Sequence, residues 1–133
     1  MFANWSVLTV DDGSFARGII WHHLVRLGFK NIFEVSDGEQ ALPSLRSARM
    51  RLVIANRYMP VLNGLKLFCG MQTDPTLKGI PFVMINMDDN RETIDDAAKL
   101  GVRHYLVKSF NAEIFDTKAH EILLQPVTEI LSE

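Results

Sequence analysis

Short hydrophobic runs alternate along the chain with longer stretches of helical periodicity. The runs are rich in β-branched and aromatic residues, and they predict strands at Ser6–Val10, Ile32–Val35, Leu52–Ala55, Phe82–Ile85 and His104–Val107. The first, third and fourth runs are almost continuously apolar. That pattern is typical of central strands in a parallel sheet that helices cover on both faces.

Helical periodicity fills the segments between the strands. It predicts helices over Ser14–Leu27, from Asp37 to about Ser47, from Asn63, from Asp89 to Leu100, and from about Asn111 to Leu124. Ser14 and Asp37 are the expected N-cap residues of the first two helices. Asp89 followed by Glu92 resembles a capping box, and Gly28 supplies the stop of the first helix. Strict alternation of strand and helix predicts an α/β domain with one parallel sheet.

Composition is that of one globular domain, with 133 residues of which 47% are hydrophobic and 23% charged. We expect a single domain over residues 1–125 and a C-terminal tail over 126–133. The net charge of −2 gives no reason to expect nucleic-acid binding. A single cysteine, Cys69, and the lack of any apolar run near ~18 residues predict a cytoplasmic protein without membrane insertion.

Polar residues follow four of the predicted strands directly. Asp11 and Asp12 follow the first, Asn56 the third, Asn86 the fourth and Lys108 the fifth. Because the carboxyl ends of parallel strands share one edge of the sheet, these side chains are expected to lie together. Paired acids suit Mg²⁺, and a lysine opposite them suits a phosphoryl group.

Nucleotide binding at this edge is excluded by the first strand-to-helix turn. A pyrophosphate needs glycines and free N–H groups there, and Asp11 and Asp12 would repel it instead. Gly13 and Gly18 have the spacing of a P-loop, but Ile19 stands where that motif requires lysine.

Four stretches together carry a family resemblance. They are Val10-Asp11-Asp12, Ser36-Asp37-Gly38-Glu39-Gln40-Ala41-Leu42, Met59-Pro60-Val61-Leu62-Asn63-Gly64 and Leu106-Val107-Lys108-Ser109-Phe110. In this order and with these gaps, the chain resembles a response-regulator receiver domain of the CheY-like family from Ser6 to about Leu124. The resemblance implies a doubly wound, flavodoxin-like fold with five strands in the order 2-1-3-4-5.

The resemblance also implies roles for individual residues. Asp11 and Asp12 match the metal-binding acids, and the backbone carbonyl of Tyr58 matches a further metal ligand. Lys108 matches the phosphate-sensing lysine, and Tyr105 matches the aromatic residue whose rotation reports activation. Two simpler roles stay open: Lys108 as an ion-pair partner of Asp11 or Asp12, and Tyr105 as an amphipathic side chain at the sheet edge.

Three positions depart from the family pattern. Asn56 stands at the phosphoacceptor position, and an amide cannot form an acyl phosphate. Asn86 stands at the switch position and lacks the hydroxyl, although it can donate to Asp12 or Asn56. Ser109 replaces the proline after the lysine, so the Lys108–Ser109 bond is expected to be trans, because a non-proline cis bond costs ~3 kcal/mol.

The missing carboxylate at position 56 also changes the charge of the site. Its absence removes roughly 4 kcal/mol of repulsion between neighbouring acids, for charges ~4 Å apart at an effective dielectric constant of about 20. We therefore expect a pocket that needs no cofactor and holds Mg²⁺ only weakly.

These features predict a stand-alone pseudo-receiver, a phosphorylation-independent protein-interaction module of bacterial signalling without a catalytic residue. The expected partner is a signalling protein: a histidine kinase, a chemotaxis or motility component, or an output protein. It would dock on the fourth helix, fifth strand and fifth helix, or on the first-helix face with Trp21 and His22, where Gly18 and Val25 also lie.

Three alternatives stay open. The chain can be an ordinary Mg²⁺-dependent, phosphorylatable regulator with an Asp-to-Asn substitution at position 56. It can be an enzyme that uses Asp11, Asp12 and Lys108 for another hydrolysis or transfer. A ligand or partner can also replace phosphate as the signal.

Overall fold

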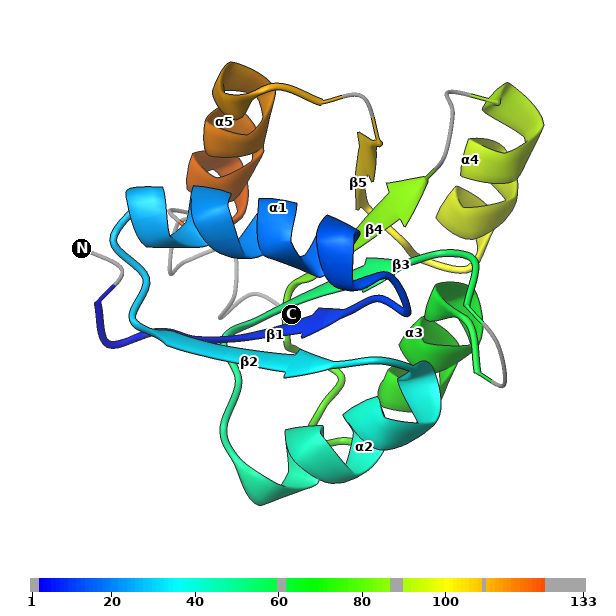
Figure 1. Cartoon of the computed structure of the whole chain (residues 1–133). Helices are drawn as coiled ribbons and strands as arrows, with labels where there is room; N and C mark the ends of the chain where they lie inside the picture. Colours follow the sequence, from blue (N-terminus) through cyan, green and yellow to red (C-terminus); the bar gives the residue numbers. More distant parts are fainter. Residues whose placement is uncertain (1–2, 60–61, 87–89, 109, 124–133) are drawn as a thin grey trace.

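The computed structural model describes residues 3–59, 62–86, 90–108 and 110–123 (Figure 1). Within this part of the chain, strands and helices alternate as predicted. They are β1 (Ser6–Val10), α1 (Ser14–Arg26), β2 (Asn31–Val35), α2 (Gly38–Ser47), β3 (Leu52–Asn56), α3 (Gly64–Gln72), β4 (Phe82–Asn86), α4 (Arg91–Lys99), β5 (His104–Val107) and α5 (Ala112–Leu123).

The strands form one parallel sheet in the order β2-β1-β3-β4-β5, which confirms the predicted fold. Its register places Val10 of β1 beside Ala55 of β3, and Asn56 of β3 beside Ile85 of β4. The strands therefore end nearly level with one another. The residues that follow them meet at one edge of the sheet.

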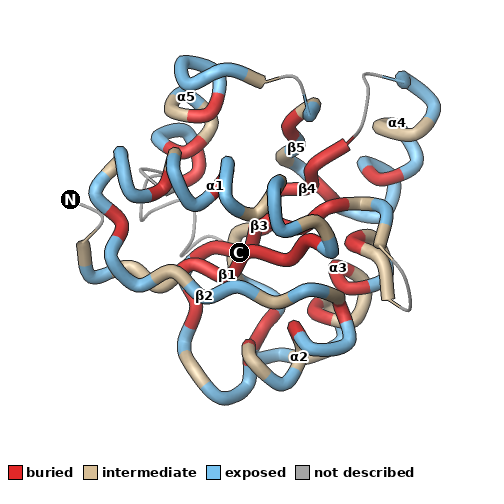
Figure 2. Tube along the Cα trace, viewed as in Figure 1, coloured by how far each residue is buried: buried red, intermediate tan, exposed pale blue. Residues whose placement is uncertain are grey.

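Helices cover both faces of the sheet (Figure 1). Helices α1 and α5 pack on one face around a core that includes Val7, Leu24 and Phe115. Helices α2, α3 and α4 cover the other face, where Leu8 and Met84 are fully buried. Figure 2 shows the result, with a buried sheet between helices whose outer sides are exposed. β3 and β4 are buried along their whole length, as their apolar sequences predict.

Two of the three predicted N-caps are wrong. Asp37 caps α2 as expected, since its carboxylate accepts a backbone N–H of the first turn at 2.8 Å. The N-cap of α1 is Gly13 and not Ser14, because the helix begins one residue earlier than the capping pattern suggests. The N-cap of α4 is Asn90 and not Asp89; the Asn90 side chain accepts a backbone N–H at 3.2 Å.

The helix ends agree better with the sequence. Gly28 has a φ of 100°, the left-handed conformation that suits glycine after a helix. Helix α5 reaches Leu123, so the predicted tail over 126–133 lies outside the described residues. Among the residues described, no helix has both the length and the apolar character needed to cross a membrane.

Contacts between α1 and α5 fix one side of the molecule. The His23 ring stacks on Phe115 with 5.0 Å between ring centroids. Arg26 donates two hydrogen bonds to the carboxylate of Asp116. Burial lowers the pKa of His23, and the neighbouring Arg26 lowers it further, which favours the neutral ring in this stack.

Gly64 lets the first turn of α3 approach the end of β3. Its backbone N–H donates to the Arg57 carbonyl at 3.1 Å. A Cβ at position 64 would lie 2.4 Å from the Asn56 carbonyl oxygen, a separation that no side chain tolerates. The glycine therefore holds the loop after β3 in place.

We predict that Gly64→Ala lowers the free energy of unfolding by about 1–3 kcal/mol, because the backbone must move to make room. The matched control is Gly70→Ala in the same helix, where the added Cβ would contact only Leu42 at 3.8 Å. That control should gain about 0.5–1 kcal/mol through helix propensity. Urea unfolding of both variants measures the difference, and equal effects of the two substitutions would contradict the prediction.

Candidate functional site

The end of β1 supplies two carboxylates in different environments. Asp11 is buried, and its Oδ1 accepts the backbone N–H of Gly13 at 2.8 Å. Arg17 donates to the backbone carbonyl of Asp11 and so holds the same turn from α1. Asp12 is exposed. One acid is thus committed to the turn, and the other faces solvent.

The end of β3 supplies Asn56, which is only 3% exposed. Its side-chain oxygen accepts the backbone N–H of Tyr58 at 3.3 Å. This bond turns the loop back on itself two residues after the strand. The Tyr58 ring is exposed, whereas the amide at position 56 is a buried, neutral part of the loop.

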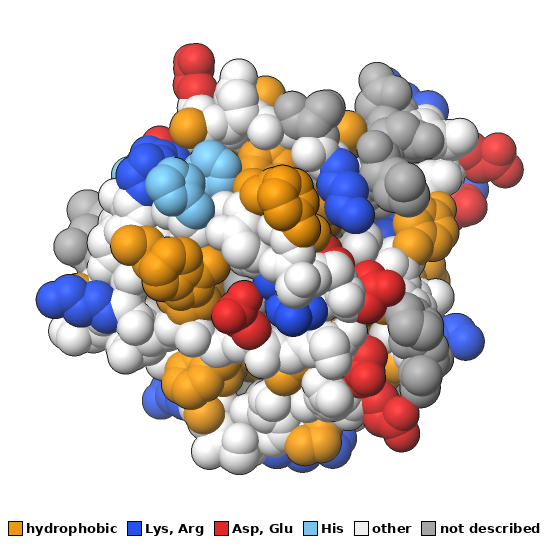
Figure 3. All heavy atoms as spheres, viewed as in Figure 1, with side chains coloured by type: hydrophobic (Ala, Val, Ile, Leu, Met, Phe, Trp, Pro, Cys, Tyr) orange, Lys and Arg blue, Asp and Glu red, His pale blue; other side chains and the backbone are white. Residues whose placement is uncertain are grey.

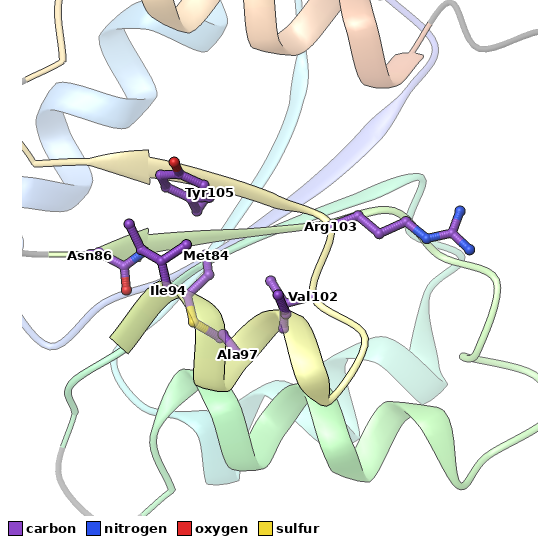
Figure 4. Close-up of a pocket in the computed structure, with 8 residues that line it drawn as sticks. Met84, Asn86, Ile94, Ala97, Val102, Arg103 and Tyr105 are labelled. Atoms are coloured by element: carbon purple, nitrogen blue, oxygen red, sulfur yellow. The ribbon is translucent and has the colours of Figure 1, made fainter. Parts of the chain in front are cut away.

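The end of β4 supplies Asn86, whose Oδ1 is buried and has no hydrogen-bond partner in the described part of the chain. The predicted hydrogen bonds from Asn86 to Asp12 or Asn56 are not formed. The side chain instead borders a cavity of about 90 Å³ between β4, β5 and α4. Figure 4 shows Tyr105 of β5 and Ile94 of α4 beside it. A mostly apolar lining leaves the Asn86 oxygen without a donor.

The end of β5 supplies Lys108, whose backbone N–H donates to the Asn86 carbonyl at 2.8 Å. Its side chain is exposed and forms no ion pair with Asp11 or Asp12, so the proposed ion-pair role is wrong in this structure. An exposed ammonium group keeps its hydration at the sheet edge, which offsets the attraction. The Lys108–Ser109 bond, predicted to be trans, lies outside the described residues.

The two aromatic positions predicted from the sequence lie on the surface. Tyr105 is 39% exposed and lines the same cavity as Asn86. Trp21, with 47% of its surface exposed, and His22 belong to the solvent face of α1 and not to the strand ends. Their proposed part in an interface stays a prediction.

The oxygen atoms at the strand ends are of the kind that binds Mg²⁺, but the neutral amide of Asn56 leaves them with less negative charge than an aspartate at that position would give. Asp11, Asp12, the Asn56 amide and the Tyr58 carbonyl are all oxygen ligands of the kind that Mg²⁺ prefers. One oxygen of Asp11 and that of Asn56 already accept backbone N–H groups. Within the described ranges, no cluster of three His, Cys, Asp or Glu side chains could hold a metal.

Arg57 is a residue of this site that the sequence analysis missed. Its guanidinium donates to the Thr93 backbone carbonyl in α4 at 2.9 Å and lies 4.0 Å from the sulfur of Met84. It joins the loop after β3 to the helix across the sheet edge. A cation directly after a buried strand was the available signal, but only the structure shows where it reaches.

Comparisons with known proteins agree on one family. A family model, the response regulator receiver domain, matches residues 7–120. The chain is 37% identical to the chemotaxis protein CheY of Pseudomonas aeruginosa, over 87% of this chain and 94% of that protein. It is 38% identical to CheY-3 of Vibrio cholerae, over 90% and 92%. The solved structure of CheY4 of Vibrio cholerae superimposes with a TM-score of 0.81 at 26% identity, covering 89% of this chain and 98% of that one.

The chain belongs to the response regulator receiver domain family. It is a CheY-like receiver domain of bacterial signal transduction, which confirms the resemblance seen in the sequence.

We predict that Arg57→Leu loosens α4, because the helix loses a charge-assisted hydrogen bond worth about 1.5–3 kcal/mol. Amide hydrogen exchange in α4 should become faster, and the free energy of unfolding should fall by a similar amount. Arg91→Leu is the control, since it removes an exposed arginine from α4 itself. Unchanged exchange in Arg57→Leu would show that the hydrogen bond does not hold the helix.

Proposed function

We propose that this receiver domain acts as a pseudo-receiver, a protein-interaction module that is not switched by aspartyl phosphorylation. The observation that carries the proposal is Asn56 itself. It is buried at the end of β3, at the position that matches the family's phosphoacceptor, and its side-chain oxygen accepts the Tyr58 N–H. A neutral amide is not a useful nucleophile towards phosphorus.

The switch positions support the same proposal. Asn86 has no hydroxyl to contact a phosphoryl group, and its oxygen borders the cavity under Tyr105. Lys108 is exposed and forms no ion pair with Asp11 or Asp12 among the described residues. With no acyl phosphate to contact, neither side chain has a phosphoryl group to stabilise.

Mg²⁺ is a weak and dispensable ligand in this proposal. Asp11, Asp12 and the Tyr58 carbonyl would hold it, with Asn56 as a neutral fourth oxygen. When bound, the ion supplies positive charge that neutralises phosphoryl oxygens. In this chain the residues keep two acids and a lysine at the strand ends, and the site charge is one unit less negative than with an aspartate at position 56.

A groove next to β5 is the proposed docking surface for a signalling partner. It has a volume of about 290 Å³ and is lined by Tyr105, Leu106, Val107, Phe110, Ile114 and Lys118. The half-exposed Ile114 and the partly exposed Tyr105 offer apolar area, and Lys118, whose ammonium group pairs with Glu121 at 3.6 Å, also lines the groove. The proposed partner is a histidine kinase, a chemotaxis or motility component, or an output protein; the relatives named above are chemotaxis proteins.

We predict that a small phosphodonor with Mg²⁺ leaves the mass of the protein unchanged, because no carboxylate stands at position 56. Asn56→Asp, treated in the same way, should gain one phosphoryl group that is lost on mild base treatment. Intact-protein mass spectrometry measures both. A base-labile phosphoryl group on the unchanged chain would disprove the proposal.

We also predict that Asn56→Asp binds Mg²⁺ about tenfold or more tightly than the unchanged chain, because it adds a negative charge beside Asp11 and Asp12. Isothermal titration calorimetry measures the two affinities. Asp12→Asn is the matched control, and it should bind Mg²⁺ more weakly than the unchanged chain does. Equal affinities for the unchanged chain and Asn56→Asp would show that position 56 does not contribute to the metal site.

A further inference from the structure

Helix α1 carries an unusually apolar outer face. Its inner side buries Ile20 and Leu24 in the core. Four further apolar side chains of the same helix are exposed: Phe15, Ile19, Trp21 and Val25. Phe15 is 82% exposed, the highest value among the large hydrophobic residues described. Figure 3 shows hydrophobic side chains over α1 on the face turned to the viewer.

The exposed side chains surround a glycine in the helix interior. At 100° per residue, Gly18 lies between Phe15 and Ile19 on one side and Trp21 and Val25 on the other. A Cβ at Gly18 would meet no atom within 4 Å, so nothing inside the fold requires glycine there. An interior glycine costs a helix about 1 kcal/mol relative to alanine. The close approach of another backbone would explain it, because small residues let helices pack at short distance.

The spacing of the aromatic residues indicates a second copy of the same helix. Phe15 lies three residues before Gly18, and Trp21 lies three residues after it. When two α1 helices cross antiparallel at Gly18, Phe15 of both copies lies on one side of the crossing and Trp21 of both copies lies on the other. A two-fold axis then forms both aromatic contacts at once, as in any isologous interface.

Charges at the ends of α1 agree with an antiparallel pair. Asp12 is exposed just before the helix, and His22 is exposed in its second half. An antiparallel crossing brings Asp12 of one copy towards His22 of the other. It also places the positive end of each helix dipole near the negative end of its neighbour.

We propose that two copies of this chain associate through α1, antiparallel and with Gly18 at the crossing point. The four exposed apolar side chains offer on the order of 400 Å², about half of one side of a standard interface. The dimer is therefore weak and reversible. Formation of the dimer does not depend on the chemistry of Asn56. A test that disproves the dimer would therefore leave the proposed function unaffected, and the reverse also holds.

Sedimentation equilibrium over about 10–500 µM tests self-association, a range suited to a weak complex. The mean mass should rise from the monomer value of 15.1 kDa towards twice that value. Phe15→Lys should weaken association about tenfold or more. The control, Phe33→Lys, removes an exposed phenylalanine from β2 and should leave association unchanged, because Phe33 is paired with Leu8 on the face of the sheet opposite α1. A mass that stays monomeric across the range would overturn the proposal.

Gly18→Ala distinguishes the effect of this residue on the stability of the monomer from its effect on association. At about 1 µM, where the chain is monomeric, the substitution should raise the unfolding temperature by roughly 2–4 °C through helix propensity. At high concentration it should weaken association, because the added Cβ stands between the two backbones. Stabilisation of the monomer together with unchanged association would overturn the crossing at Gly18.

Cross-linking then tests whether a second copy of the chain covers the exposed face of α1 in this orientation. In a Cys69→Ala background, Gly18→Cys should form a covalent dimer on mild oxidation, because the two-fold crossing brings the two cysteines together. Gly79→Cys is the control, since it replaces another glycine with open space around it. Equal rates of cross-linking for the two variants would overturn the proposed geometry.

Discussion

The parallel register of β1, β3 and β4 is the constraint on which the rest of the site depends. It ends the three strands at one level, so Asp11, Asn56 and Asn86 must all enter the protein interior at the same edge. Each is less than a tenth exposed. Burial of three polar side chains this close together is costly unless each has a hydrogen-bond partner. The local structure around the site follows from how each one is satisfied.

Asp11 and Asn56 are satisfied in the same way, by a backbone N–H two residues further along the chain. The amide at position 56 makes this arrangement compatible with burial, because it brings no second charge next to Asp11. Asn86 is the exception, since its oxygen has no donor among the described residues. The cavity beside Asn86 therefore holds the one buried oxygen of these three side chains that lacks a donor among the described residues, and it shares Tyr105 with the groove where a partner is proposed to dock.

The fold was predictable because its signals are redundant. The apolar runs of β3 and β4 and the strict alternation of elements each point to a parallel sheet, and the family resemblance supplied the strand order. Local details depend on single atoms and were less predictable. Gly13 rather than Ser14 caps α1, and Asn90 rather than Asp89 caps α4. At the N-terminus of each of these two helices, two neighbouring residues could act as the N-cap. The backbone conformation of the preceding loop decides which of them does.

In the site, too, the positions of the residues were predictable from the sequence, whereas their side-chain contacts were not. The sequence placed Asp11, Asn56, Asn86 and Lys108 at one edge, because topology alone decides which residues follow parallel strands. The contacts that it suggested for Asn86 and Lys108 are not formed among the described residues. The contact of Arg57 with α4 depends on where a long side chain extends, and the missing partner of Asn86 depends on the shape of a cavity. Neither property is encoded in residue spacing.

The central claim is that Asn56 removes phosphorylation as the switch of this receiver domain. Amide ¹H–¹⁵N spectra of the unchanged chain, recorded with Mg²⁺ before and after addition of a small phosphodonor, test it most directly. We predict that the phosphodonor leaves the resonances of α4, β5 and α5 where they were. A second set of resonances from these elements that grows with the phosphodonor and decays after its removal would contradict the claim.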